Sequence, residues 1–319
     1  MYKLTLAVIT HNRANLLKQM LDSVLLQTYK DFYVIIYDNC SSDNTADIAK
    51  PFLSDSRFTY HRHEKVIGNF NYALGHCDTD YLVILHDDDI MLPDMISEEM
   101  KIMENRSDVS LVFVNMNYID SNNKMFESSV LDRYMGNEDY IIKSREYIQI
   151  LMGKNNIVCC PTVMFRMALV RKHNFNFTIT GGGGDLFLWL EMNQIDYNFY
   201  YISKALYNYR QHSAADSSKK TFIFPKLRVT VYNLLLKNNY PKEILKKWIK
   251  HIDWHLIYQL KKATERKKAF NEIKNIILFN DKRDNKLLFN VFLIFYIYPH
   301  YKRLKVFLKK VFGNNSDAK

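Results

Sequence analysis

The chain has 319 residues, of which 48% are hydrophobic, enough for one large or two small globular domains with a sizeable core. Nine Gly and six Pro exclude a fibrous or disordered composition. The net charge of +10 is unevenly divided, because residues 219–319 hold 24 Lys and Arg against 7 Asp and Glu, whereas residues 1–218 hold 20 against 27. A slightly acidic body therefore precedes a strongly basic tail.

The cysteines and the start of the chain indicate the compartment. Cys40, Cys77, Cys159 and Cys160 form no C-x-x-C pair, so a disulfide scaffold is not expected and a reducing cytosol fits better. The first residues run directly into a strand pattern, without the charged region, apolar stretch and cleavage site of a signal peptide. We therefore expect a cytoplasmic protein.

The first hundred or so residues alternate between strand and helix periodicity. Short runs of apolar and β-branched residues predict strands at 4–10, 32–37, 58–61, 81–85 and 111–114. Apolar residues at helical spacing follow Leu16, and shorter helices are predicted to begin near Thr45 and Gly68. This alternation predicts an α/β fold, in which helices flank a mostly parallel central sheet and ligands bind beyond the carboxyl ends of the strands.

Carboxylates stand at two of these strand ends. Asp38 ends the second strand, and Asp87, Asp88 and Asp89 follow the fourth. Adjacent ionised carboxylates raise one another's pKa unless a cation lies among them. Because oxygen ligands in a short run suit Mg²⁺ or Mn²⁺, the sequence predicts a divalent-metal site completed by phosphate oxygens and water. The alternative is a solvated acidic turn, with Asp89 or Asp94 capping the next helix.

Four motifs around these carboxylates occur in an order that resembles family 2 glycosyltransferases of the GT-A fold, of the bacterial polysaccharide type. They are V-I-T-H-N-R at 8–13, D-N-x-S-x-D-x-T at 38–45, G-N-F-N-Y-A at 68–73 and L-H-D-D-D-I-x-L-P at 85–93. The resemblance covers residues 3–215. It implies a GT-A catalytic domain at 1–218, with a nucleotide-sugar half at 1–115 and an acceptor half at 116–218, before a basic helical region at 219–319.

The resemblance assigns donor-binding roles in the first half of the chain. A nucleotide-sugar, above all a UDP-sugar, would contact residues at the strand ends and in the third motif, namely Thr10, Asn12, Arg13, Asp38 and Asn71. The D-x-D region, with Asp87, Asp88 and Asp89, would hold the metal and the ribose, so Asp87 and Asp88 also count as donor contacts. His86 stands where the family often has its first Asp, and which two of the three carboxylates face the ion stays open.

The second half supplies residues for the chemistry. Four glycines precede Asp185 and an apolar, helix-like stretch, so Asp185 is a plausible N-cap. By resemblance Asp185 is also the catalytic base, although the family's preceding Glu is Gly184 here. The segment Tyr209-Arg210-Gln211-His212 matches the family's Y-R-x-H. There His212 would complete the metal site, or is an ordinary surface histidine, and Arg210 would pair with a phosphate.

The reaction implied by the resemblance is inverting and metal-dependent. Asp185 would accept the proton of an acceptor hydroxyl while that oxygen attacks C1 of the sugar nucleotide. The acceptor would be a glycan or a lipid-linked hydroxyl in cell-surface polysaccharide synthesis. A non-catalytic nucleotide-sugar-binding scaffold and a sugar nucleotidyltransferase are the alternatives. The chain contains neither a P-loop motif nor a G-x-G-x-x-G fingerprint, so a nicotinamide cofactor has no support.

The basic tail reads as helices that combine Lys clusters with aromatic and apolar stretches. The longest such stretch, 287–298, is too short for a membrane span, which needs about 20 residues. Aromatic surface next to Lys and Arg is typical of helices on anionic lipid, so we expect peripheral attachment to the cytoplasmic face of the inner membrane. A helical cap on the sheet is the alternative. No nucleic-acid partner is expected, because no recognised module accompanies the charge.

Overall fold

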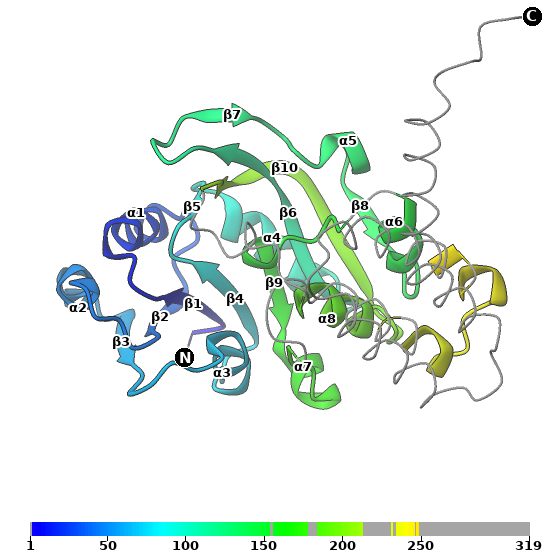
Figure 1. The fold of residues 1–319 in the computed structure, drawn as a ribbon, viewed down its shortest axis with the longest axis horizontal. Coiled ribbons are helices and arrows are strands. Elements are labelled where there is room, and N and C mark those ends of the chain that lie inside the picture. Colours follow the sequence, from blue (N-terminus) through cyan, green and yellow to red (C-terminus); the bar gives the residue numbers. More distant parts are fainter. Residues whose placement is uncertain are drawn as a thin grey trace, which may run out of the picture. The chain divides into compact units, whose positions relative to one another are not determined.

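The computed structural model describes residues 2–153, 156–177, 184–212, 231, 234–245 and 247–248 (Figure 1). The chain divides into two compact units, Met1–Lys220 and Thr221–Lys319. Most of the basic tail lies outside the described residues, so its membrane attachment and the border at 218/219 stay predictions. Within the part that is described, no helix has the length and apolar character needed to cross a membrane.

The first unit is built on one mixed sheet. Its strands are β1 (Leu4–Thr10), β2 (Phe32–Asp38), β3 (Phe58–Arg62), β4 (Tyr81–His86), β5 (Ile90–Met91), β6 (Val109–Ile119), β7 (Met125–Glu127), β8 (Tyr140–Ile142), β9 (Val163–Arg166) and β10 (Asn198–Arg210). Their order is β3-β2-β1-β4-β9-β6-β10-β5, with β7 on β6 and β8 on β10. Since β9 runs antiparallel to both β4 and β6, the strands β3, β2, β1, β4, β6 and β10 share one direction. The predicted α/β sheet is confirmed.

Helices connect the strands and flank the sheet (Figure 1). They are α1 (Ala14–Leu25), α2 (Thr45–Ala49), the 3-10 helix η1 (Lys50–Ser54), α3 (Asn69–Gly75), α4 (Met95–Asn105), α5 (Asp132–Met135), α6 (Tyr147–Gly153), the 3-10 helix η2 (Cys160–Thr162), α7 (Met167–His173) and α8 (Gly184–Met192). In α1, residues Leu17, Met20, Leu21 and Val24 are fully buried. Their spacing of three and four places them on one helix face, against the sheet.

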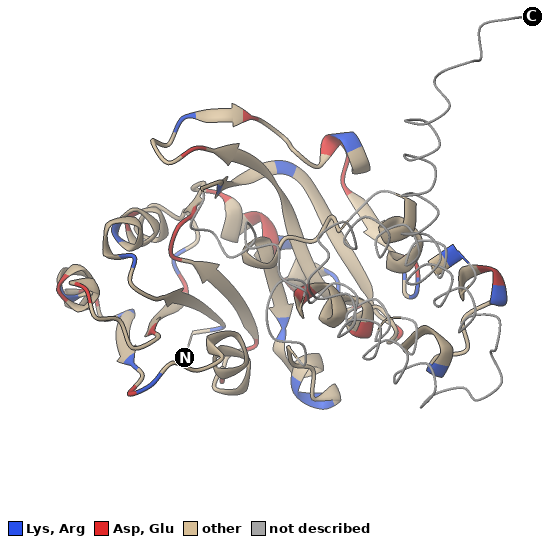
Figure 2. Cartoon of the chain, viewed as in Figure 1, with Lys and Arg blue, Asp and Glu red and all other residues tan. Residues whose placement is uncertain are grey.

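The apolar core ends at one edge of the sheet. β1 and β4 are buried along almost their whole length, as expected for parallel strands covered on both faces. In the strand register, Thr10 of β1 lies opposite Asp38 of β2, and Ile9 lies opposite His86 of β4. Polar residues from three neighbouring strands therefore meet at the carboxyl edge, and Figure 2 shows acidic residues in the segment that connects β4 to β5.

Candidate functional site

The three aspartates after β4 are buried and have separate partners. The exposed fractions of Asp87, Asp88 and Asp89 are 1%, 7% and 1%. Arg13 Nη1 donates to Asp87 Oδ1 at 2.9 Å and to Asp88 Oδ2 at 3.1 Å. His212 Nε2 lies 2.9 Å from the same Asp88 oxygen. A solvated acidic turn is therefore not what the chain forms here.

Asp89 points to the carboxyl end of β10. Its Oδ2 accepts a hydrogen bond of 3.0 Å from the Tyr207 hydroxyl, and its Oδ1 accepts one of 2.7 Å from the backbone N–H of Arg210. Burial, together with the neighbouring charge of Asp88, raises the pKa of Asp89 well above its usual value. Ionised Asp89 consequently needs a cation close by.

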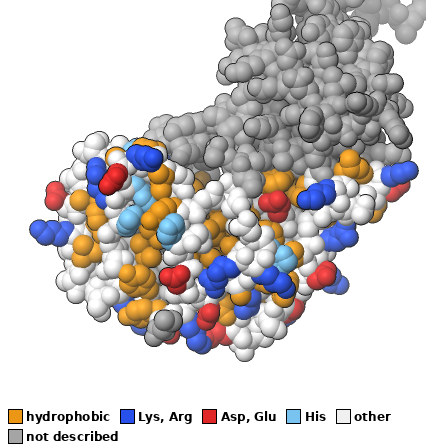
Figure 3. All heavy atoms as spheres, turned by 90° about the horizontal axis from the view of Figure 1, so that it is seen from below, with side chains coloured by type: hydrophobic (Ala, Val, Ile, Leu, Met, Phe, Trp, Pro, Cys, Tyr) orange, Lys and Arg blue, Asp and Glu red, His pale blue; other side chains and the backbone are white. Residues whose placement is uncertain are grey.

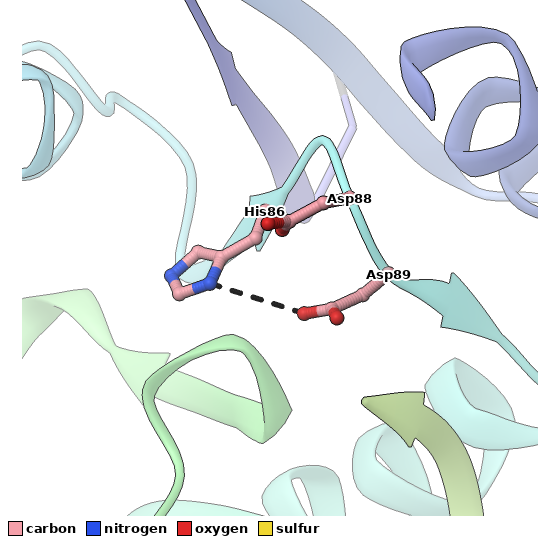
Figure 4. Close-up of side chains that lie close together, drawn as sticks. All are labelled: His86, Asp88 and Asp89. Carbon is pink, nitrogen blue, oxygen red and sulfur yellow. Dashed lines mark ion pairs between the residues drawn. The ribbon is translucent and has the colours of Figure 1, made fainter. Parts of the chain in front are cut away.

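Three side chains from the end of β4 and the following turn form a possible metal centre (Figure 4). His86, Asp88 and Asp89 each offer one ligand atom, and these atoms lie within 4.8 Å of one another. His86 Nδ1 is 3.8 Å from Asp89 Oδ2. One imidazole nitrogen and two carboxylate oxygens fit a divalent ion such as Mn²⁺, and the buried, poorly compensated Asp89 gives that ion an electrostatic reason to bind.

The pKa values of the other two aspartates are shifted in opposite directions. Burial raises the pKa of Asp87 to about 6, although Arg13 opposes this. Burial also acts to raise the pKa of Asp88, but His86, His212 and Arg13 together lower it below its usual value. Asp88 is therefore the member of the run that stays ionised most readily.

Arg210 connects the turn after β4 to other elements of the first unit through hydrogen bonds. Its Nε donates to the backbone oxygen of Asp88 at 2.6 Å, and its Nη1 donates to Asp120 O at 2.9 Å and to Asn123 Oδ1 at 2.6 Å. Its Nη2 donates to Gln19 Oε1 at 3.1 Å. The buried guanidinium thus joins α1, the turn after β4 and the β6–β7 hairpin. Its expected pairing with a phosphate stays a prediction.

The edge of the sheet next to this turn is ordered by side-chain hydrogen bonds. Asp38 accepts from the Tyr60 hydroxyl at 2.5 Å and from the Ser41 N–H at 2.8 Å. Asn12 has a φ of 54°, in the left-handed region that Asn tolerates. Its N–H donates to Ser41 Oγ at 2.9 Å, and its Oδ1 accepts from the Ser42 N–H at 2.7 Å. Thr10, Asn12 and Asp38 therefore share one rigid corner.

Aromatic rings gather beside Asp38. The N–H of His63 donates to Asp38 O at 2.9 Å, and the rings of His63 and Tyr72 meet edge to face at 4.5 Å. Tyr72 also contacts Tyr37 and stacks on His76 at 3.8 Å. Figure 3 shows histidine side chains next to hydrophobic ones on one face of the molecule. Flat aromatic faces of this kind suit stacking with a planar ring such as a nucleobase.

Asn71, a predicted donor contact on α3, has a structural partner. Its Nδ2 donates to Phe177 O at 3.0 Å, and its Oδ1 accepts from the Phe177 N–H at 2.7 Å. The amide group thus holds the backbone of a residue 106 positions away. The structure does not bring Asn71 into the hydrogen-bond network of Asp87 to Asp89.

Asp185 lies in the first turn of α8. Burial raises the pKa of Asp185, against hydrogen bonds from the backbone and from Asn156. Burial, followed by the charges of Asp89 and Asp185, raises the pKa of the Cys159 thiol.

Several members of the site could not be identified from the sequence. His86 was noticed only as a departure from the family pattern, although its position next to the carboxylates was a usable signal. Tyr207 and Tyr60 hydrogen-bond to carboxylates 118 and 22 positions away, respectively. No motif spacing relates those pairs, so only the fold reveals them.

An α/β sheet with the His86, Asp88 and Asp89 cluster at its carboxyl edge defines an α/β protein with a candidate metal site. Residues 5–173 match the family model described as "Glycosyl transferase family 2", and the chain belongs to that family. The predicted family is thereby confirmed.

Several similar proteins are also named as glycosyltransferases. The chain is 27% identical over 199 residues to "Uncharacterized glycosyltransferase MJ1057" of Methanocaldococcus jannaschii, which covers 61% of this chain and 65% of the relative. It is 25% identical over 194 residues to the Escherichia coli protein "UDP-Glc:alpha-D-GlcNAc-diphosphoundecaprenol beta-1,3-glucosyltransferase WfgD". This match covers 60% of this chain and 70% of that relative. A match to an uncharacterized glycosyltransferase of Rickettsia felis covers only 30% of that relative. The chain thus spans from under a third to about two thirds of the first relatives' length.

Solved structures share the fold. The S. aureus TarS fragment 1–349 in complex with UDP-GlcNAc superposes with a TM-score of 0.68 at 17% identity, over 95% of this chain and 88% of that one. The mannosyltransferase PcManGT of Pyrobaculum calidifontis, in complex with GDP-Man and Mn²⁺, superposes with a TM-score of 0.51 at 15% identity. This superposition covers 94% of this chain and 88% of that one. These likenesses confirm the GT-A fold.

Proposed function

We propose that the protein is an inverting, metal-dependent glycosyltransferase. It moves a sugar from a nucleotide-sugar, above all a UDP-sugar, to a hydroxyl of a glycan or lipid-linked acceptor. The observation that carries this proposal is the cluster of His86, Asp88 and Asp89, whose ligand atoms lie within 4.8 Å of one another, together with the Asp185 carboxyl in the first turn of α8. Sugar transfer needs such a pair of sites, one for the departing diphosphate and one for the attacking hydroxyl.

The donor nucleotide is assigned to the carboxyl edge of β1 and β2. Thr10, Asn12 and Asp38 form one corner of this site, and the exposed rings of His61 and His76, which stack on Tyr72, offer aromatic faces for the base. Arg13, which bridges Asp87 and Asp88, is placed to contact the diphosphate, since guanidinium groups pair well with phosphate oxygens.

His86, Asp88 and Asp89 would hold Mn²⁺ or Mg²⁺, and the imidazole nitrogen favours Mn²⁺. An ion bound there supplies positive charge to the diphosphate leaving group. His212 supports Asp88 from the end of β10 and completes the set of residues around the ion. Asp87, paired with Arg13, contributes to donor binding and adds negative charge to the metal site.

Asp185 acts on the acceptor. It takes the proton of the acceptor hydroxyl as that oxygen bonds to C1 of the sugar, while the bond from C1 to the diphosphate oxygen breaks. The configuration at C1 inverts, and no covalent enzyme intermediate forms. Burial raises the pKa of Asp185, which makes its carboxylate a stronger base than an exposed one.

The relatives support the substrate class. The TarS fragment was solved with UDP-GlcNAc, and the name of WfgD specifies a UDP-Glc donor and a diphosphoundecaprenol-linked acceptor. For this chain we accordingly propose a UDP-sugar donor, a role in cell-surface polysaccharide synthesis, and peripheral attachment at the cytoplasmic membrane face. No nucleic-acid partner is part of the proposal.

Thermal unfolding with nucleotides tests the donor site. UDP, GDP and dTDP are added with and without Mn²⁺, and UDP with Mn²⁺ is expected to raise the melting temperature most, because a ligand that binds only the folded state stabilises it. Turnover of the matching UDP-sugar must release UDP. Release of pyrophosphate would instead identify a nucleotidyltransferase, and binding without turnover would indicate a scaffold.

A further inference from the structure

Three aromatic side chains from different strands form a partly open surface, here called the aromatic platform. It consists of Tyr118 on β6, Phe126 on β7 and Tyr209 on β10. The ring centroid of Tyr118 lies 6.0 Å from that of Phe126 and 6.0 Å from that of Tyr209, with tilts of 32° and 58°. Phe126 is 56% exposed, so the core does not account for its ring.

The platform is fixed relative to the carboxylate run. Tyr118 lies opposite Tyr209 in the register of β6 and β10, and Arg210 follows directly. Arg210 holds both the Asp88 backbone and the hairpin that carries Phe126, through Asp120 O and Asn123 Oδ1. A ligand on these rings would therefore keep a set position relative to the Asp88 turn.

The strand that carries Tyr118 also borders the segment with Cys159, because β6 pairs with β9 and contacts η2. Burial, followed by the neighbouring Cys159, raises the pKa of the Tyr118 phenol. The segment containing Cys159 leads into η2, which contacts β4 and β6. The platform thus shares β10 with Tyr207 and Arg210, the two residues that hydrogen-bond to the turn of Asp88 and Asp89.

The chemistry around the rings favours an uncharged, amphipathic ligand. Arg133 and Glu127 form an ion pair beside the platform, so these two charges offset each other. Two of the three rings are tyrosines, which combine an apolar face with a hydroxyl. A sugar ring has the matching surfaces, because its C–H groups form an apolar face and its rim is lined with hydroxyls.

We propose that the aromatic platform binds a sugar ring of the acceptor, which makes Tyr118, Phe126 and Tyr209 acceptor-binding residues. This inference rests on the proposed function and deepens it, since it names a glycan, and not a bare lipid headgroup, as the group next to the transferred sugar.

The test uses saturation-transfer NMR on the full chain with UDP and Mg²⁺, which avoids the line broadening caused by Mn²⁺. The probes are methyl glycosides of glucose, galactose, mannose, N-acetylglucosamine and rhamnose. At least one is expected to receive saturation from the wild-type protein. Phe126→Ala is expected to weaken its binding about three- to tenfold, the range for losing one aromatic contact. Phe126→Trp should preserve binding, and so should Leu53→Ala, which removes another exposed apolar side chain, on η1.

Four results would overturn the inference. If UDP stabilises the protein but no glycoside receives saturation, or if Phe126→Ala leaves the signal intact, the platform does not bind sugar while the proposed function stands. If Phe126→Ala instead releases the protein from phosphatidylglycerol vesicles and leaves glycoside binding unchanged, the surface contacts lipid. If none of UDP, GDP and dTDP stabilises the wild-type protein in the presence of Mn²⁺, the proposed function fails and the inference with it.

Discussion

His212 Nε2 lies 2.9 Å from Asp88 Oδ2, although 124 positions separate the two residues. The contact joins the end of β10 to the turn after β4 and helps to lower the pKa of Asp88. The Asp88 carboxylate thereby stays ionised beside two other buried aspartates, which is the condition for binding a cation.

Removing that imidazole is expected to weaken metal binding. In His212→Ala the pKa of Asp88 rises and one support of the cluster is lost, so Mn²⁺ affinity in the presence of UDP should fall about 10- to 100-fold. Titrating Mn²⁺ while following thermal stability measures the effect. His173→Ala, which removes an exposed histidine on α7, is the matched control and should bind Mn²⁺ like the wild-type protein. Unchanged affinity in His212→Ala would remove His212 from the metal site.

Asp185→Asn is expected to separate binding from catalysis. An amide cannot accept the hydroxyl proton, so transfer should fall about 10²- to 10⁴-fold, while UDP still raises the melting temperature. In the wild-type protein, kcat/KM should increase with pH through the raised pKa of Asp185, because only the ionised carboxylate acts as a base. Full transfer by Asp185→Asn would mean that another group is the base.

Much of this arrangement was readable in the sequence, and the remainder was not, for physical reasons. The runs at 4–10, 32–37 and 81–85 are continuous and apolar, which is typical of strands buried on both faces, and all three occur as predicted. β10 was not predicted, because Ser203 and Lys204 interrupt its apolar pattern and its pairing with β6 has register shifts there.

The candidate site was likewise only partly predictable from the sequence. Asp38 and the aspartates after β4 were identifiable, since strand ends of a parallel sheet meet at one edge. The contacts of Arg210 were not, because its acceptors lie between 87 and 191 positions away, and such pairings arise only from tertiary packing. For the same reason, the pairing of Asn71 with Phe177 was not predictable.

Arg210→Met is expected to destabilise the folded protein. The substitution removes four hydrogen bonds from a charged donor and leaves the buried backbone oxygen of Asp88 without that donor, so the free energy of unfolding should fall by about 3 kcal/mol or more. Urea denaturation measures this change. The control, Arg106→Met, breaks an ion pair with Asp108 on the surface, which is worth roughly 0–1 kcal/mol. Equal losses in both variants would contradict the anchoring role of Arg210.

Glu99 on α4 is expected to make stability depend on pH. Burial raises its pKa well above 4.5, and a hydrogen bond from the Met164 backbone offsets only part of this. Between 4.5 and the raised pKa the folded state binds more protons than the unfolded state, so the free energy of unfolding decreases as pH rises.

Glu99→Gln removes this dependence. Its stability relative to the wild-type protein should therefore improve as the pH rises above about 5 through the neutral range, as measured by urea denaturation at each pH. Glu98→Gln, at a partly exposed neighbouring position, is the control and should show no comparable gain. A constant difference between Glu99→Gln and the wild-type protein across this range would show that Glu99 is ionised in the fold.

The central claim is that His86, Asp88 and Asp89 hold a divalent ion against the diphosphate of a nucleotide. Anomalous X-ray scattering from crystals grown with UDP and Mn²⁺ tests it most directly. The account predicts a manganese peak within coordination distance of His86, Asp88 or Asp89 and of the diphosphate oxygens. Density for UDP without a manganese peak, with Arg13 still bridging Asp87 and Asp88, would contradict it.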